Sequence, residues 1–256
     1  MSGPKWRIIA AAGAALGLLA IIGYLAVALT VPPRLGLSSG SSATPRTTPD
    51  GSASTAAACR RPVLPSAAAT PQALSLWLIQ SGSVVGYRVR ERFVQLPSPH
   101  EAVARTKRVS GWVLASQTGS GIQVETGCVA VEVATLKSVD SIPGYGTEGR
   151  DQIYPTLFET DRNPYVIFQP YPVSLDGPRE GQTIHVALPG ILEMRGVAKA
   201  VQFSLDVKLS SGKVFAAGSA PVDVNDYGLG VIEGPEGFIA IDPRCTLELS
   251  LILSKV

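Results

Sequence analysis

The chain has 256 residues, enough for one or two domains, and only 16% of them are charged. Its net charge of +2 is unevenly distributed: up to Ser75 six Lys and Arg residues face the single acid Asp50, whereas from Leu76 onward 16 basic residues face 19 acidic ones. The basic excess therefore lies outside the part predicted to be globular. This argues against a folded nucleic-acid-binding surface, so no nucleic-acid partner is expected.

The first predicted element is a hydrophobic segment. Ile8 to Val31 contains no charged residue, and as a helix its 24 residues would be about 36 Å long, enough to cross a hydrocarbon core of about 30 Å. Lys5 and Arg7 precede it, which favours a cytoplasmic N-terminus. Ala26-Val27-Ala28 also fits a signal-peptidase site, so a cleaved signal peptide is the alternative. We expect residues 1–31 to be a cytoplasmic tip and a single transmembrane helix, which places the rest of the chain outside the cytoplasm at the cell membrane.

Residues 32–75 form the second region. Pro32 to about Thr70 is rich in Ser, Thr, Ala, Pro and Gly and has almost no large apolar residues. Such a composition cannot bury enough surface to offset the entropy of ordering, so a flexible linker is predicted. It would act as a stalk for the following domain or simply as a spacer.

The third region, residues 76–256, shows repeated alternation of apolar and polar side chains. Near its start Val85, Tyr87 and Val89 share one parity, and Gly86, Arg88, Arg90 and Arg92 share the other. This pattern is typical of a strand with one buried face. It recurs about eight times, so an all-β fold with an eight-stranded antiparallel barrel is expected. The remaining alternating stretches are residues 109–114, 121–136, 165–169, 183–192, 201–209, 214–222 and 246–253.

One segment departs from this alternation. In Gly149 to Thr160, Asp151 fits a helix N-cap, and Pro155 limits the helix to about a turn or two. We expect a short helix that closes one end of the barrel. Its apolar side is predicted to consist of Ile153, Leu157 and Phe158.

Several short motifs occur in a fixed order: Ser83-Val84-Val85-Gly86-Tyr87-Arg88-Val89, Val109-Ser110-Gly111, Arg150-Asp151, Leu157-Phe158-Glu159, Pro164-Tyr165-Val166-Ile167-Phe168, Pro189-Gly190-Ile191-Leu192, Gly196-Val197-Ala198-Lys199 and Leu247-Glu248-Leu249. As an ordered set they resemble the YceI-like family of lipocalin-like barrels that bind polyisoprenoid lipids. The resemblance covers roughly Leu76 to Val256. It implies a barrel that holds a long apolar chain inside, in a protein that is commonly exported. Arg195 stands where the family commonly has a His, so no role of that His is transferred.

The expected ligand is therefore a long-chain isoprenoid-type lipid inside the barrel. Burial of each methylene would contribute about 0.8 kcal/mol, so the length of the chain supplies affinity. The alternative is an interior filled by side chains, which alternation alone does not distinguish. Arg150 is the candidate for a phosphate contact, or else pairs with Asp151 to hold the helix. The predicted ligand-binding residues are Val85, Tyr87, Val89, Trp112, Val131, Val133, Arg150, Phe168, Val186, Phe203, Leu205, Leu249 and Leu251.

The sequence shows no arrangement that supports catalysis, a cofactor or a metal. His100 and His185 are isolated and are expected on the surface, and neither G-x-S-x-G, C-x-x-C nor H-x-x-x-H occurs. Gly144 to Gly149 spells G-x-G-x-x-G but lacks the flanking βαβ pattern, so a loop is expected, and a mobile lip at the barrel mouth is its hypothesised role. A basic stripe on the solvated outer face, with Glu91 and Glu101 as partners or a lipid phosphate as ligand, is predicted from Arg88, Arg90, Arg92, Arg105, Lys107 and Arg108.

Three cysteines are present: Cys59, Cys128 and Cys245. In an exported protein two of them can pair. In an up-and-down barrel the starts of the third and last strands lie at opposite ends, which disfavours a bond between Cys128 and Cys245. A Cys59–Cys128 disulfide, with Cys245 buried and free, is favoured.

These inferences lead to one functional hypothesis and one alternative. The hypothesis is a membrane-anchored extracytoplasmic protein that holds a polyisoprenoid-like lipid for carriage or sequestration and performs no chemistry. The alternative is a filled barrel that acts as a protein-interaction or stress-related surface module.

Overall fold

The computed structural model describes residues 31–37, 58–62, 74–93, 99–119, 121–142, 146–229 and 239–256. Apart from Val31, the predicted membrane helix lies outside these ranges, as does most of the predicted linker. In the described part of the chain, no helix has both the length and the apolar character needed to cross a membrane.

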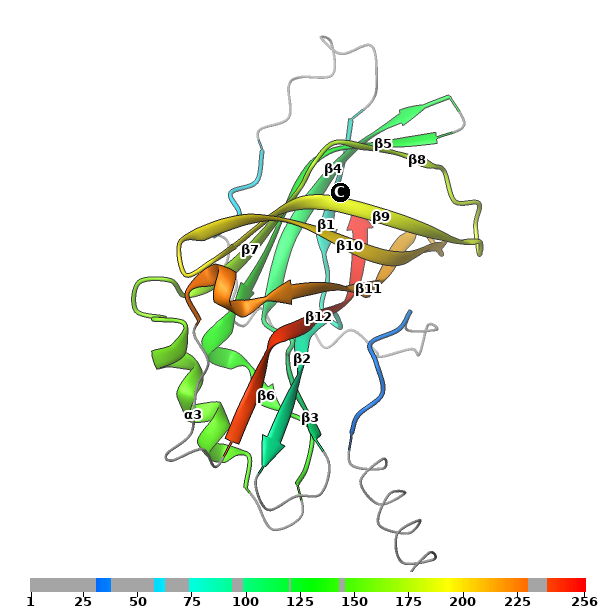
Figure 1. Ribbon diagram of the computed structural model, residues 1–256. Helices are drawn as coiled ribbons and strands as arrows, with labels where there is room; N and C mark the ends of the chain where they lie inside the picture. Colours follow the sequence, from blue (N-terminus) through cyan, green and yellow to red (C-terminus); the bar gives the residue numbers. More distant parts are fainter. Residues whose placement is uncertain are drawn as a thin grey trace, which may run out of the picture.

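The strands form one closed antiparallel barrel with eight strand positions (Figure 1). β1 and β2 together occupy one strand position of the barrel, because both pair with β12. β3 and β4 together occupy the next position, because β3 pairs with β2 and β4 with β1. β7 and β8 share a position in the same way, because both pair with β5. Pairing of Trp77 with Lys255 closes the ring, which confirms the predicted eight-stranded antiparallel barrel. The strands are β1 (Leu74–Ile79), β2 (Val84–Phe93), β3 (His100–Thr106), β4 (Val109–Thr118), β5 (Gly121–Glu132), β6 (Lys137–Ser138), β7 (Tyr165–Pro170), β8 (Val173–Asp176), β9 (Thr183–Met194), β10 (Val197–Ser210), β11 (Lys213–Asp223) and β12 (Ile239–Lys255).

Alternation decides which side chains enter the barrel. On β10, Phe203 and Leu205 are buried, whereas Ser204 and Asp206 are exposed. Gly86 interrupts the outward row of β2 because a Cβ there would lie 2.1 Å from the carbonyl oxygen of Ala104 on β3. Glycine thus permits the close approach of these two strands.

The helix α3 (Glu148–Leu157) lies at the end of the barrel where β2 ends, here called the α3 end (Figure 1). Its N-cap is Thr147, so the predicted capping role of Asp151 is wrong; Asp151 instead accepts a hydrogen bond from the Ser138 N–H at 2.8 Å. The ten-residue helix is longer than expected and continues two residues past Pro155. Tyr154 and Phe158 are buried and Leu157 packs against the core, so the predicted apolar side is confirmed for Leu157 and Phe158 and is wrong for Ile153, which is exposed. Two short 3₁₀ helices, η1 (Val133–Thr135) and η2 (Val224–Tyr227), complete the described elements.

The predicted G-x-G-x-x-G loop is only partly described. Residues 143–145 lie outside the described ranges, and Glu148 and Gly149 already belong to the first turn of α3. No strand of a βαβ unit surrounds the motif in the described sheet, which is antiparallel throughout its strand pairings. Its role as a mobile lip remains a prediction.

A second apolar cluster lies on the outer face of β1, β4 and β5. Cys59 covers it and forms a disulfide with Cys128, with 5.6 Å between the two Cα atoms. Cys245 is buried and free, so the expected pairing is confirmed. The Trp112 indole N–H donates to the carbonyl oxygen of Arg60 at 3.1 Å. The cluster consists of Cys59, Leu76, Trp112, Leu114, Cys128 and Ala130, with Ala58, Leu74, Leu78 and Ile167 packed against it.

Residues 31–37, here called the docked segment, lie along the outer face of β2, β3 and β12, although a flexible linker was expected to begin at Pro32. Arg88 Nη2 donates to the Pro32 carbonyl at 2.7 Å, and Arg105 donates to the Pro33 carbonyl. Farther along, Ser250 Oγ donates to the Gly36 carbonyl at 3.1 Å. This end of the presumed linker is therefore held by side chains of the barrel.

The docked segment covers a buried ion-pair network. Arg88 Nε donates to Glu248 Oε1 at 2.6 Å, and Arg88 Nη1 donates to Glu101 Oε2 at 2.9 Å. Arg34 of the docked segment lies 3.9 Å from the same Glu248 carboxylate. Arg88 is only 3% exposed, so the expectation that it lies on a solvated stripe is wrong, whereas its predicted pairing with Glu101 is confirmed. Arg90 and Arg92 are exposed as expected.

Candidate functional site

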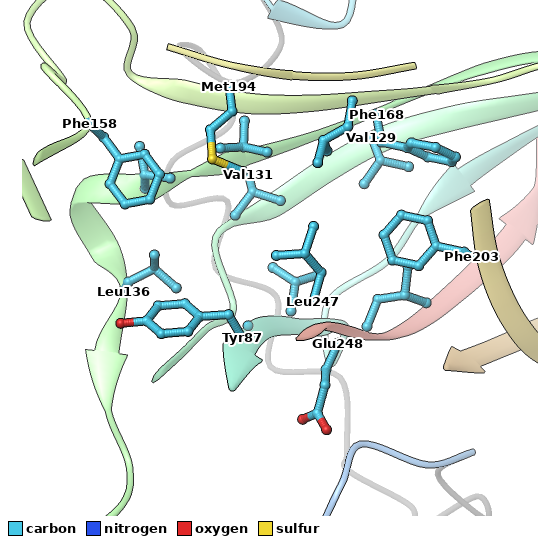
Figure 2. A pocket seen from close by; sticks show the side chains of 16 residues that line it. Tyr87, Val129, Val131, Leu136, Phe158, Phe168, Met194, Phe203, Leu247 and Glu248 are labelled. Carbon is cyan, nitrogen blue, oxygen red and sulfur yellow. The ribbon is translucent and has the colours of Figure 1, made fainter. Parts of the chain in front are cut away.

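An apolar cavity occupies the half of the barrel nearest the α3 end (Figure 2). About 90 Å³ of it can hold the centre of a water-sized sphere. A single water needs roughly 10–15 Å³ by this measure, so the space accommodates several methylene-sized groups. Its lining comprises Val85, Gly86, Tyr87, Val129, Val131, Val133, Leu136, Phe158, Val166, Phe168, Leu192, Met194, Phe203, Leu247, Glu248 and Leu249.

The other half of the barrel, here called the packed half, contains the inward residues Val186, Leu205, Leu251 and Leu253. Phe168 and Phe203 lie where the two halves meet, in an edge-to-face contact with ring centroids 5.0 Å apart. The cavity lining combines valines of β2, β5 and β7 with larger leucine, methionine and aromatic side chains. The free space therefore comes from how these side chains pack against one another, since large residues occur in both halves.

Seven of the predicted ligand-binding residues line the cavity: Val85, Tyr87, Val131, Val133, Phe168, Phe203 and Leu249. Val89, Val186, Leu205 and Leu251 are buried in the same core but do not line it. Trp112 was expected to face inward, and this is wrong: it has the opposite parity to Val109 and Val113 and faces the outer cluster. Arg150 does not line the cavity either.

The analysis of the sequence missed several lining residues: Val129, Leu136, Phe158, Val166, Leu192, Met194 and Leu247. Val129 and Leu247 share the inward parity of their neighbours on β5 and β12, and Met194 continues the alternation of β9, so that signal was present. Leu136 and Phe158 follow a 3₁₀ turn and a helix, where strand alternation has no meaning. Glu248 contributes to the wall, but its carboxylate points away from the other labelled side chains (Figure 2), toward the network beneath the docked segment.

Two tyrosine hydroxyls meet at the α3 end of the cavity. Tyr87, which lines the cavity, and Tyr154 of α3 place their hydroxyl oxygens 2.8 Å apart, and their rings pack edge to face. Burial raises the pKa of both phenols above the ordinary value of 10.0, so both are neutral hydrogen-bonding groups at physiological pH. The pair ties the helix to β2 and gives this end of the cavity a polar group.

A buried ionic cluster lies beyond the tyrosines. Arg150 of α3 donates to Glu91 Oε2 at 2.7 Å and to Asp140 Oδ1 at 2.8 Å. Asp140 also lies 2.7 Å from His100 Nε2 and accepts the Val103 N–H at 2.9 Å. His100 is therefore buried in β3, and its predicted surface position is wrong. Glu91 has the same parity as Val85, Tyr87 and Val89, which explains its inward position.

The pKa values of the two carboxyl groups of this cluster, Glu91 and Asp140, are shifted in opposite directions. Burial raises the pKa of Glu91 above its ordinary 4.5, and the favourable field of Arg150 does not fully offset it. Burial also acts to raise the pKa of Asp140, but hydrogen bonds from His100, the Val103 N–H and Arg150 outweigh it and leave the pKa below 3.8. Burial acts to lower the pKa of Arg150, but the two carboxylates outweigh it and leave it raised. Arg150 thus has two carboxylate partners and does not pair with Asp151 as the alternative prediction proposed.

A further polar chain lies on the outer surface. His185 Nε2 is 3.0 Å from Ser204 Oγ, and His185 Nδ1 is 3.1 Å from Asp206 Oδ1. The order of groups is that of a serine hydrolase, but the His side chain is 70% exposed on a sheet face, and none of the three lines the described cavity. A water-exposed serine without an oxyanion-stabilising pocket is a weak nucleophile. The prediction that His185 is a surface residue is confirmed. Among the described residues no group of three or more His, Cys, Asp or Glu side chains could hold a metal ion.

Two solved structures are similar to this chain, and the first of them shares its fold. A polyisoprenoid binding domain from Saccharophagus degradans, implicated in plant cell wall breakdown, aligns with a TM-score of 0.51 at 15% identity, covering 71% of this chain and 99% of that one. BcnA of Burkholderia cenocepacia aligns with a TM-score of 0.44 at 15% identity, covering 66% of this chain and 95% of that one. No curated protein matches the sequence. The model of the YceI-like domain matches residues 80–253, which span the barrel from the first turn to the last strand, and the chain therefore belongs to the YceI-like family.

Proposed function

We propose that this chain is a membrane-anchored extracytoplasmic protein that holds a long polyisoprenoid-like lipid in its barrel, for carriage or sequestration. The observation that carries the proposal is the apolar cavity inside a closed barrel. Apart from the Glu248 carboxylate, which is directed outward, and the Tyr87 hydroxyl, which is bonded to Tyr154, its lining side chains are hydrocarbon, aromatic or thioether groups. Such a lining favours an apolar chain over a polar ligand.

Family membership adds to this argument. The solved domain from Saccharophagus degradans is described as polyisoprenoid binding, and it shares the barrel fold with this chain. Transfer of that ligand class to this chain rests on the cavity, because fold alone does not specify function.

The size of the cavity sets a condition on binding. The free space suits a short length of hydrocarbon, so a long isoprenoid requires the lining to widen or a part of the chain to remain outside. Phe158 and Met194, at the α3 end, are the lining side chains nearest to α3 and to the β9–β10 turn. Met is the more adaptable of the two because its thioether chain has three rotatable bonds.

Membrane anchoring is the second part of the proposal. It is supported by the uncharged stretch from Ile8 to Val31 and by the cations that precede it. The disulfide between Cys59 and Cys128 supports an extracytoplasmic barrel, because such bonds persist in oxidising compartments.

Native mass spectrometry of the full chain after extraction in mild detergent tests lipid binding. The wild type is expected to retain an isoprenoid-sized mass or to take up an added long-chain polyprenol. Val131→Phe places a ring in the cavity and should abolish this adduct, whereas Val139→Phe, the same change at an exposed position, should leave it intact. Absence of any adduct from the wild type, before and after incubation with polyprenol, would refute the proposal.

The packed half favours the second candidate, a barrel used as a protein-interaction module. In that case the residual cavity is a packing defect and binds nothing. The same experiment separates the two functions, because a module would give a bare protein mass for the wild type and for both variants.

A further inference from the structure

The docked segment has a defined direction along the barrel. Pro32 is held at Arg88, Pro33 at Arg105, and Gly36 at Ser250. Arg105 pairs with Gly86 and Ser250 pairs with Val84, so from Pro32 to Gly36 the chain moves toward the start of β2. The docked segment therefore begins on the side of the α3 end. In Figure 1 the docked segment is the blue trace beside the barrel.

The distance from Arg88, where Pro32 is held, to the α3 end of the barrel can be compared with the length of chain available before the proposed membrane span. Arg88 and Phe93, the last residue of β2, are five residues apart, which is about 17 Å along the strand and about 13 Å along the axis of a barrel with the usual tilt. The uncharged stretch 8–31 is 24 residues long, and about 20 suffice to cross a bilayer. The surplus of about four residues spans about 13 Å when extended. The α3 end would then lie at the level of the lipid headgroups.

The outer face of β2 on this side exposes two arginines, while Glu101 lies opposite Arg90 on β3 and α3 exposes Glu148. Arg90 and Arg92 are exposed on the outer face of β2, between Arg88 and the end of the strand. Each cation close to an anionic leaflet contributes about 1 kcal/mol of attraction. This basic surface, defined by Arg90 and Arg92, lies on the side of the barrel where the docked segment begins.

We propose that the docked segment holds the barrel with its α3 end against the headgroups of the bilayer, so that the partner of this end is an anionic lipid surface. The cavity lies in the half of the barrel nearest that end. A lipid in the adjacent leaflet would therefore lie close to the end of the cavity that α3 and the Tyr87–Tyr154 pair cover. This inference rests on the anchored lipid-binding function proposed above and adds to it an orientation and a loading surface.

Fluorescence quenching in vesicles tests the orientation. The full chain is reconstituted in vesicles of phosphatidylcholine and phosphatidylglycerol that contain a headgroup spin-labelled lipid, and a thiol-reactive fluorophore is attached at Pro99→Cys or Lys213→Cys. Pro99 is exposed at the α3 end, and Lys213 is exposed at the opposite end. The native Cys245 stays unlabelled because it is buried and its pKa is raised to about 12. Quenching is expected to be several-fold stronger at residue 99 than at residue 213.

Two matched insertions test whether the docked segment sets this orientation. Ten Gly and Ser residues placed between Val31 and Pro32 lengthen the connection by about 18 Å on average and should remove most of the difference between the two labels. The same ten residues between Leu37 and Ser38 leave the docked segment in place and should change nothing. Equal quenching of the two labels in the wild type, or equal effects of the two insertions, would overturn the inference.

The lipid-binding proposal is judged separately in the same samples. Native mass spectrometry should show the isoprenoid adduct in both insertion variants. Loss of the adduct with the quenching pattern intact would refute lipid binding and leave the orientation standing. A chain that begins after Ala28 and is recovered free of membrane would overturn the orientation, whereas a retained adduct in that chain would still support lipid binding.

Discussion

The hollow and packed halves of the barrel are built from the same strands with the same alternation. On β12 Leu249 lines the cavity, and Leu251, the next inward residue, is packed. On β9 Leu192 and Met194 line the cavity, whereas Val186 lies in the packed half. Large side chains occur in both halves, and among the described residues it is the hollow half that ends in the buried ionic cluster. The comparison shows that alternation determines which residues point inward but does not determine how closely they pack.

The largest expected effect concerns the ionic cluster at the cavity end, which has no counterpart among the described residues of the packed half. Arg150→Ala would leave Glu91 and Asp140 buried without their cation and should lower the free energy of unfolding by about 3–5 kcal/mol. Arg244→Ala, which removes an exposed partner of Asp242, should cost about 1 kcal/mol or less. Urea unfolding measures both. Similar losses in the two variants would show that the cluster does not support the hollow half.

The second prediction compares one residue type across the two halves. Leu251→Ala should destabilise the barrel by about 2–5 kcal/mol, because its side chain is surrounded by packed atoms. Leu249→Ala should cost less, since part of its surface already faces free space. Thermal and urea unfolding of the two variants give the comparison directly. If Leu249→Ala proves the more damaging, the cavity is filled in solution.

The third prediction adds volume in place of removing it. Val186→Phe forces a ring into the packed half and should cost about 1–3 kcal/mol. Val131→Phe places the ring in the cavity and should change stability by about 1 kcal/mol or less. Unfolding midpoints measured without added lipid test this, and equal penalties would contradict the proposed difference between the halves.

The smallest effect is a dependence on pH. Because the native pKa of Glu91 lies above its unfolded value of 4.5, the native state binds this proton more tightly, and stability should fall as pH rises from 4.5 through the native pKa. The native pKa of Asp140 is shifted downward instead, so its contribution to the free energy of unfolding is lost only as pH falls below 3.8. Glu91→Gln should therefore flatten the decline in stability above pH 4.5. An unchanged slope in this variant, followed by urea unfolding, would exclude Glu91 as its source.

The strand order and the inward parity were predictable because alternation is a local property of the sequence. Val85, Tyr87, Val131 and Leu249 were placed correctly by this rule. Trp112 was misplaced because β4 carries apolar residues on both faces, and nothing local shows that the outer face is covered by Cys59 and its neighbours.

The ionic cluster could not be predicted for a different reason. Glu91, His100, Asp140 and Arg150 come from four separate elements or loops, and they meet only when the barrel closes. The docked segment is similar: Pro32 to Gly36 looks like linker by composition, and backbone carbonyls, which every sequence has, make its contacts. Hydrogen bonds accepted by backbone carbonyls do not depend on residue type, so the sequence does not predict them.

The disulfide between Cys59 and Cys128 links residues 69 positions apart. In the chain-entropy description a closed loop of this size adds about 4 kcal/mol, a large part of what a domain has in total. The wall formed by β1, β4 and β5 therefore acquires its cover, and much of its resistance to unfolding, only when two thiols have been oxidised. Folding of the protein is in this way linked to the redox state of the compartment in which it occurs. A chain kept under reducing conditions would have a lower free energy of unfolding and would be cleaved more readily by proteases.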